Sequence, residues 1–156
     1  MCSAFSQLQG LNYAKMNKED VERVIAYGTV HLDFCIELYK MQHENGVYFL
    51  HEHPHGASSW HNRKMLELLN TPGVHRIKSH MCAFGMYDYD HQGGGLVKKP
   101  TGFMTNSIKL TEILEKDCSG DHRHVVLLGG GRARRAQVYP NGLCRRIIIG
   151  LRNQMI

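Results

Sequence analysis

The chain contains Val47-Tyr48-Phe49-Leu50, followed by His51-Glu52-His53-Pro54, and the expected fold is built outward from this segment. The first four residues form an unbroken apolar run, which is typical of a strand buried on both faces of a parallel sheet. Ligands bind at the carboxyl ends of strands in open sheets, so we expect Glu52 to lie at the mouth of a pocket. A protonated carboxyl group there can donate a proton to a bound base. The alternative is an acid that pairs with the neighbouring histidines.

Helices and strands alternate on both sides of this run. A long helix is expected from Asn17, which can cap it, to about His43, because apolar residues recur at helical spacing and Asn45-Gly46 follows as a stop. The alternation predicts an α/β fold with a mostly parallel sheet and flanking helices. Further helices are expected over 59–69, over 107–116 and from about 140, further strands over 74–79 and 102–105, and irregular chain over 87–95 and 118–139.

Length and composition indicate a single domain over residues 1–156. Apolar residues make up 42% of the chain and charged residues 21%, which is near the average for globular proteins. No apolar run reaches the roughly 20 residues of a membrane helix, and the first ten residues lack the pattern of a signal peptide. The five cysteines are scattered, which favours a reducing compartment over a disulfide framework. We therefore expect an intracellular protein with no membrane partner.

Positive charge collects in the second part of the chain. The formal net charge is +5, and much of the excess lies after residue 97. A basic face suits the phosphate backbone of DNA, because neutralised phosphates release counterions; the alternative is a solvated basic surface. Trp60 could stack on a base, but we expect it to anchor the helix that follows it. The candidate phosphate or base contacts are Lys98, Lys99, Arg132, Arg134 and Arg135.

A short segment carries three side chains of the kind that zinc prefers. Cys118, His122 and His124 lie close together in the sequence, and zinc is therefore a candidate cofactor. His80 or Cys82 would supply a further ligand only if the fold brings it near. Because no CxxC pair or HExxH helix completes a recognised pattern, the alternative is a set of polar loop histidines.

Several segments resemble the catalytic half of the cytosine-C5 DNA methyltransferases, in the order that this family has. Cys2-Ser3-Ala4-Phe5-Ser6 is similar to the family's Pro-Cys-Gln-x-Phe-Ser loop, and residues 48–54 are similar to its following strand, which ends in Glu-Asn-Val. Phe84-Gly85 and residues 98–104 resemble the Tyr-Gly and Gln-x-Arg-x-Arg segments, and residues 137–140 with the helix after them resemble the last conserved helix. Similar modules occur inside retroelement and viral polyproteins.

The resemblance implies covalent chemistry on a cytosine that is flipped out of DNA. Cys2 would be the nucleophile that adds to C6, and Glu52 would hold and protonate the N3 edge of the base. A methyl group would then pass from S-adenosylmethionine to C5. The matched positions that would contact the DNA are Ser6, Lys98, Lys99 and Thr101.

The family's cofactor-binding start, a strand followed by Phe-x-Gly-x-Gly, has no counterpart in this sequence. The resemblance therefore implies a partial Rossmann-like fold without its first strands, in which an upstream domain or a second chain completes the S-adenosylmethionine site. The glycines at 129–131 are better explained as a turn than as a cofactor loop, because no acidic residue follows at the required distance. The alternative function is a non-catalytic, basic nucleic-acid-binding module with bound zinc, carried in a larger polyprotein.

Overall fold

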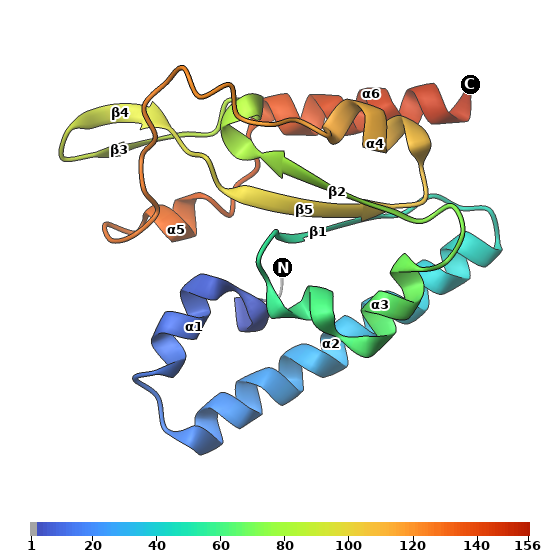
Figure 1. Cartoon of the computed structure of the whole chain (residues 1–156), viewed down its shortest axis with the longest axis horizontal. Coiled ribbons are helices and arrows are strands. Elements are labelled where there is room, and N and C mark those ends of the chain that lie inside the picture. The colour runs from blue at the N-terminus through green and yellow to red at the C-terminus, as the bar shows by residue number, and fades with distance from the viewer. Residues whose placement is uncertain (1–2) are drawn as a thin grey trace.

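The computed structural model describes residues 3–156 as a mixed α/β structure (Figure 1). Met1 and Cys2, the candidate nucleophile, lie outside the described residues. In chain order the elements are η1 (Ser3–Phe5), α1 (Gln7–Tyr13), α2 (Lys18–Glu44), β1 (Leu50–Pro54), η2 (Ser58–His61), α3 (Arg63–Leu69), β2 (His75–His80), η3 (Met81–Phe84), β3 (Tyr87–Asp90), β4 (Gly93–Leu96), β5 (Pro100–Thr105), α4 (Ile108–Leu114), α5 (Arg132–Arg135) and α6 (Asn141–Met155).

The strand β5 lies between the other two strands of the larger sheet. Within residues 3–156 the order is β1-β5-β2, and β5 is antiparallel to both neighbours. The mixed α/β character is as predicted, but these strands do not form the mostly parallel, Rossmann-like sheet that the sequence suggests. β1 and β2 do run in the same direction, with η2 and α3 between them, and β5 then pairs between the two. A buried apolar run indicates a strand but does not indicate which strand becomes its neighbour.

Helices cover both faces of this sheet: α4 and α6 lie over one face, and α2 and α3 over the other (Figure 1). Side chains alternate along a strand, so Phe103 of β5 is buried in the first layer and Met104 in the second. Trp60 is buried in the second layer, against Gly102, and its Nε1 donates to the Pro54 carbonyl at 2.9 Å. It is therefore a core anchor and offers no face for stacking.

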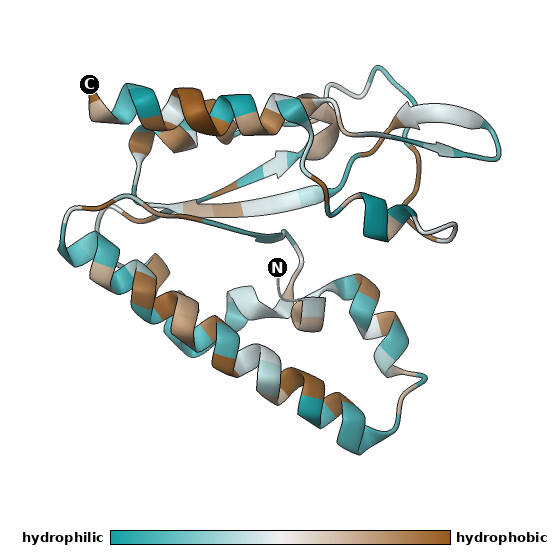
Figure 2. Cartoon of the chain, turned by 180° about the vertical axis from the view of Figure 1, so that it is seen from behind, coloured by the Kyte–Doolittle hydropathy of each residue, from teal (hydrophilic) through white to brown (hydrophobic). Residues whose placement is uncertain are grey.

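The helix α2 follows directly from its sequence. Asn17 Oδ1 accepts a hydrogen bond from the Asp20 N–H at 2.8 Å and caps the helix, and Asn45 ends it. Leu32 and Ile36 are buried on its inner side, and Figure 2 shows polar and apolar residues alternating along it. Among the described helices, none combines the length and the apolar character that a membrane span requires. The outer side of α2 carries exposed apolar residues, namely Tyr27, Val30, Phe34, Leu38 and Met41.

The glycine-rich stretch 87–95, predicted as a loop, is instead part of the β3–β4 hairpin, which projects from the sheet beside α5 (Figure 1). The sequence misleads because three consecutive glycines, Gly93 to Gly95, have a low strand propensity. In the hairpin, Tyr87 lies across Gly94, where an added Cβ would be 1.9 Å from the tyrosine hydroxyl oxygen. Glycine at this position therefore lets the exposed Tyr87 ring lie against the strand.

We predict that Gly142→Ala lowers the free energy of unfolding by roughly 1–3 kcal/mol, because α6 packs closely on η3. An added Cβ would lie 2.3 Å from the carbonyl oxygen of Phe84, which is backbone and cannot rotate away. Urea denaturation followed by circular dichroism measures the loss. Gly10→Ala in α1 is the matched control, since nothing lies within 4 Å of the added atom, and it should not destabilise the protein. Equal losses in both variants would contradict close packing at α6.

Candidate metal centre and carboxylate pocket

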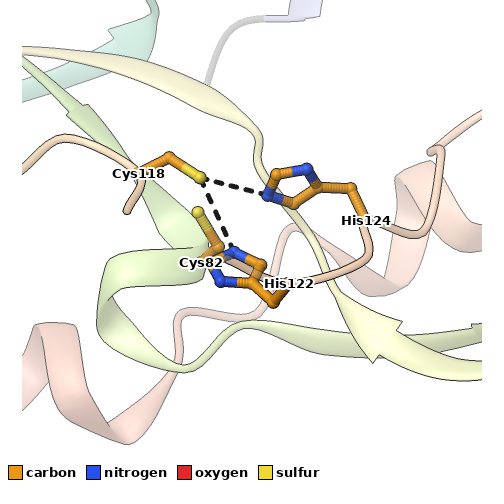
Figure 3. Close-up of side chains that lie close together, drawn as sticks. All are labelled: Cys82, Cys118, His122 and His124. Carbon is orange, nitrogen blue, oxygen red and sulfur yellow. Dashed lines mark hydrogen bonds between the residues drawn. The ribbon is translucent and has the colours of Figure 1, made fainter. Parts of the chain in front are cut away.

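Two separate parts of the chain bring four metal-ligand side chains together. Cys82 lies in η3, directly after β2, whereas the other three residues lie in the irregular segment that follows α4. The ligand atoms all lie within 4.8 Å of one another and face a common centre (Figure 3). The group consists of Cys82, Cys118, His122 and His124. It contains all three ligands proposed from the sequence and adds Cys82, which the fold brings near.

Backbone contacts hold the irregular segment beside β2 and β4. The N–H of His80 donates to the Lys116 carbonyl at 2.9 Å, and the N–H of Val125 donates to the Leu96 carbonyl at 2.8 Å. His80 is not a member of the group. Its Nδ1 accepts a hydrogen bond from the Cys118 N–H at 3.2 Å and so fixes the backbone of a ligand.

Two separations within the group are close to those of tetrahedral zinc. The Sγ atom of Cys118 is 3.6 Å from His122 Nε2 and 3.3 Å from His124 Nε2. Zn–S distances of about 2.3 Å and Zn–N distances of about 2.0–2.1 Å place sulfur and nitrogen about 3.6 Å apart around a tetrahedral ion. Cys118 and the two histidines therefore have nearly the spacing that one zinc ion would impose, and all four ligand atoms lie within 4.8 Å of one another.

Neighbouring polar groups orient these ligands. Asp121 Oδ1 lies 2.9 Å from His122 Nδ1, which directs the other ring nitrogen toward Cys118. Ser119 Oγ donates to the same carboxylate at 2.5 Å, and the Gly120 N–H donates to the Cys118 sulfur at 3.3 Å. A carboxylate behind a ligating imidazole fixes the ring orientation in known metal sites and raises the affinity.

Without a metal, burial keeps Cys82 and His124 of the group uncharged. Burial, together with the adjacent Cys118 thiol, raises the pKa of Cys82 to about 11, so this thiol stays protonated unless a positive charge is present. Burial, with a smaller contribution from His122, lowers the pKa of His124, which leaves a neutral imidazole free to ligate. A bound metal ion deprotonates coordinating thiols, and its binding energy then adds to the stability of the fold.

A second cluster surrounds Glu52 on β1, whose side chain is only 8% exposed. Its Oε2 accepts a hydrogen bond from the Tyr139 hydroxyl at 2.9 Å. Its Oε1 lies 4.0 Å from Lys99 Nζ and has no hydrogen-bond partner within residues 3–156. Burial raises the pKa of Glu52, and the Lys99 ammonium and the Tyr139 hydrogen bond oppose the shift. Burial also lowers the pKa of Lys99, against the effect of Glu52.

A cavity of about 240 Å³ lies beside Glu52, and five aromatic or imidazole rings are part of its wall. His51 and His53 are two of them, and their facing nitrogens, Nε2 and Nδ1, are 3.1 Å apart. Burial and the neighbouring His53 lower the pKa of His51 to about 3, so this ring is neutral at physiological pH. The Tyr39 hydroxyl lies 3.1 Å from the other nitrogen of His51. Glu52 thus carries the only carboxyl group among the described residues that line this cavity.

Other residues proposed from the N-terminal motif and β5 lie in structural positions. Ser6 caps α1 by accepting the Gln9 N–H at 3.1 Å, and Thr101 is buried with its hydroxyl donating to the Lys99 carbonyl at 3.1 Å. Cys2 lies outside the described residues, so its distance from Glu52 stays a prediction. The nearby Phe5 ring is described, and its centroid lies 6.4 Å from that of His53 on β1.

The proposed phosphate contacts fall into two groups. Arg132 donates to the Val126 carbonyl at 2.7 Å, and Arg135 pairs with Asp88 at 3.0 Å and donates to the Gly130 carbonyl at 2.9 Å. The glycines at 129–131 are therefore folded back onto arginine side chains, as a turn, and no strand–glycine loop–helix unit for S-adenosylmethionine forms there. The exposed cations of the set are Lys98, Arg134 and Arg135, and of these Arg135 is paired with Asp88.

The three kinds of comparison with known proteins leave the chain without a relative from which a role could be transferred. No family model, curated protein or solved structure matches it. The inference of a function therefore rests on the chemistry of the four-ligand group and of the Glu52 cavity.

Proposed function

We propose that this chain is a nucleic-acid-binding domain whose fold is completed by one zinc ion. The observation that carries the proposal is the convergence of two thiols and two imidazoles within 4.8 Å. Cys₂His₂ is a common ligand set of structural zinc sites, and it fills all four tetrahedral positions. No position is left for a water or a substrate, so the metal would have a structural role.

The zinc ion would join η3 to the segment after α4. Few buried apolar side chains hold this segment otherwise: Val125 and Ala136 belong to the core, and Leu127 packs against it. Because the segment leads on to Tyr139, the metal would also help to place the hydroxyl that contacts Glu52. The proposed zinc site thus supports the proposed binding site.

Two features favour nucleic acid as the ligand: the positive net charge of the chain and the buried environment of the Glu52 carboxyl group. The chain has a net charge of +5, and Lys98 and Arg134 are exposed to solvent. Glu52 lines a cavity that rings also line, and its buried Oε1 has no hydrogen-bond partner within residues 3–156. A carboxyl group whose pKa is raised can carry a proton and offer a donor and an acceptor side by side, which complements the N3 and N4 edge of cytosine.

A cytosine-C5 methyltransferase is the second candidate, and the Glu52 environment is the observation that favours it. A buried, protonatable carboxyl group is what that chemistry requires at the N3 edge of the base. Cys2 would be the nucleophile, and an upstream segment or a second chain would supply the S-adenosylmethionine site. The activity of this domain would depend on that partner.

The zinc proposal predicts one zinc ion per chain by elemental analysis of protein purified without added chelator. Cys82→Ser and Cys118→Ser should lose the metal and melt at a lower temperature, because each removes a ligand. Asp121→Ala should weaken zinc binding by about tenfold, since it removes only the carboxylate behind His122. Cys144→Ser, at an exposed cysteine outside the group, is the control and should keep full stoichiometry. A wild-type chain that is folded without metal and takes up no zinc when zinc is added would refute the proposal.

The Glu52 cavity predicts binding of deoxycytidine monophosphate that depends on this carboxyl group. Glu52→Ala should weaken binding, measured by isothermal titration calorimetry, by about 1.5–3 kcal/mol, the usual loss for a buried hydrogen bond to an ionisable group. Glu44→Ala, at the exposed end of α2, is the matched control and should bind like the wild type. Equal affinities for all three proteins would show that the base does not enter this cavity.

The methyltransferase candidate predicts a covalent adduct with DNA that contains 5-fluorocytosine. The chain should be expressed with the reading frame upstream of Met1 and incubated with S-adenosylmethionine, and the adduct should survive denaturing electrophoresis. Cys2→Ser should abolish it and Cys144→Ser should not. An adduct of equal yield in Cys2→Ser would remove Cys2 from the mechanism, whereas binding without any adduct would leave the non-catalytic function.

A further inference from the structure

A larger cavity adjoins the Glu52 cavity, and Tyr139 lines both. It has a volume of about 520 Å³ and lies between the β3–β4 hairpin and residues 135–141. We call it the tyrosine groove, because its walls include Tyr87, Tyr89 and Tyr139. Tyr139 thus belongs to the walls of both cavities, and a ligand that fills one cavity would be next to the other.

Two tyrosines of the groove form an exposed aromatic platform. Tyr87 and Tyr89 are 55% and 66% exposed, and their ring centroids are 5.4 Å apart at an interplanar angle of 85°. They project from the same side of β3, because residues two apart in a strand share a face. Gly94 on the paired strand leaves room for the Tyr87 ring, as an added Cβ there would overlap it. The glycine-rich strand therefore keeps the ring spread over the hairpin surface.

Other residues hold the hairpin in place, so its fold does not require these tyrosines. Asp88, which also lines the groove, is buried and pairs with Arg135 at 3.0 Å. Arg123 pairs with Asp90 at 2.8 Å and donates to the Gly93 carbonyl at 2.7 Å. Because charged pairs and backbone bonds fix the hairpin, the two exposed rings are available for a ligand.

We propose that the tyrosine groove binds single-stranded nucleic acid, with bases stacked on Tyr87 and Tyr89 beside the nucleotide held at Glu52. This inference rests on the proposed function and extends it from one base to its neighbours along the strand. Every base has a face that can stack on an aromatic ring, but only unpaired bases can present it to both tyrosines. The single strand would pass Tyr139 on its way from the groove to the Glu52 cavity.

The charge near the groove favours a nucleic acid over a proline-rich peptide, which also docks on exposed aromatic rings. Arg134, next to the groove-lining Arg135 on α5, is exposed and forms no ion pair within residues 3–156. The chain as a whole carries +5. Both the exposed arginine and the positive net charge would strengthen the binding of a phosphate backbone, whereas neither would strengthen the binding of a neutral proline-rich segment.

The test compares an oligodeoxycytidylate of about ten nucleotides with deoxycytidine monophosphate, using fluorescence anisotropy at fixed salt and the zinc-loaded full chain. Tyr87→Ala and Tyr89→Ala should each raise the Kd for the oligonucleotide by about tenfold, whereas Tyr87→Phe should not, because it keeps the ring. Tyr27→Ala is the matched control, since this tyrosine is 81% exposed on the outer face of α2. Unfolding curves check that each variant keeps the wild-type fold.

The outcomes separate the groove from the Glu52 cavity. Loss of oligonucleotide affinity in Tyr87→Ala, with unchanged mononucleotide affinity, supports the groove as a site for flanking bases. Oligonucleotide binding that depends on Tyr87 but not on Glu52 would retain the groove and reject the proposed base cavity. If Tyr87→Ala and Tyr89→Ala bind the oligonucleotide like the wild type, or a proline-rich peptide displaces it from the groove, the proposal is overturned.

Discussion

The pairing of β5 with both β1 and β2 determines how the two candidate sites and the two helical layers are placed. Pairing with β1 places the start of β5, and thus Lys99 just before it, beside Glu52. Pairing with β2 on the other side positions η3, the short helix that carries Cys82. Phe103 and Met104 point to opposite faces of β5, so one helical layer packs on each face of the sheet. Both candidate sites therefore derive from a single central strand.

The contacts around Glu52 are unfavourable for stability alone. A carboxylate and an ammonium are both buried at a separation of 4.0 Å, which is too long for a hydrogen bond, so their attraction offsets little of the desolvation. Lys99 also has a positive φ of 26°, a backbone conformation that a residue with a Cβ rarely adopts. Strained backbone and a buried unpaired oxygen in one place are typical of a site maintained for binding.

How far the sequence predicts this structure depends on whether the signal is local. The helix α2 is predicted at both ends because Asn17, the apolar spacing and Asn45-Gly46 all act within the helix. Three of the four metal ligands are also found, because they lie in one short segment. Cys82 and the Tyr139 contact with Glu52 depend on strand order, which periodicity does not encode. Because periodicity does not encode strand order, the sequence predicts a parallel sheet, whereas β5 pairs antiparallel with both of its neighbours.

The two sites are also coupled through the chain. The backbone leaves His124, enters the core at Val125 and reaches Tyr139 after the short helix α5, where Lys99 Nζ donates to the Ala136 carbonyl at 2.9 Å. With the metal absent, the Cys118 thiol would hold the start of this path only by weak sulfur hydrogen bonds. The proposed zinc ion would replace them with four coordinate bonds. The energy that orders the proposed metal centre would therefore also help to fix the tyrosine and lysine facing Glu52.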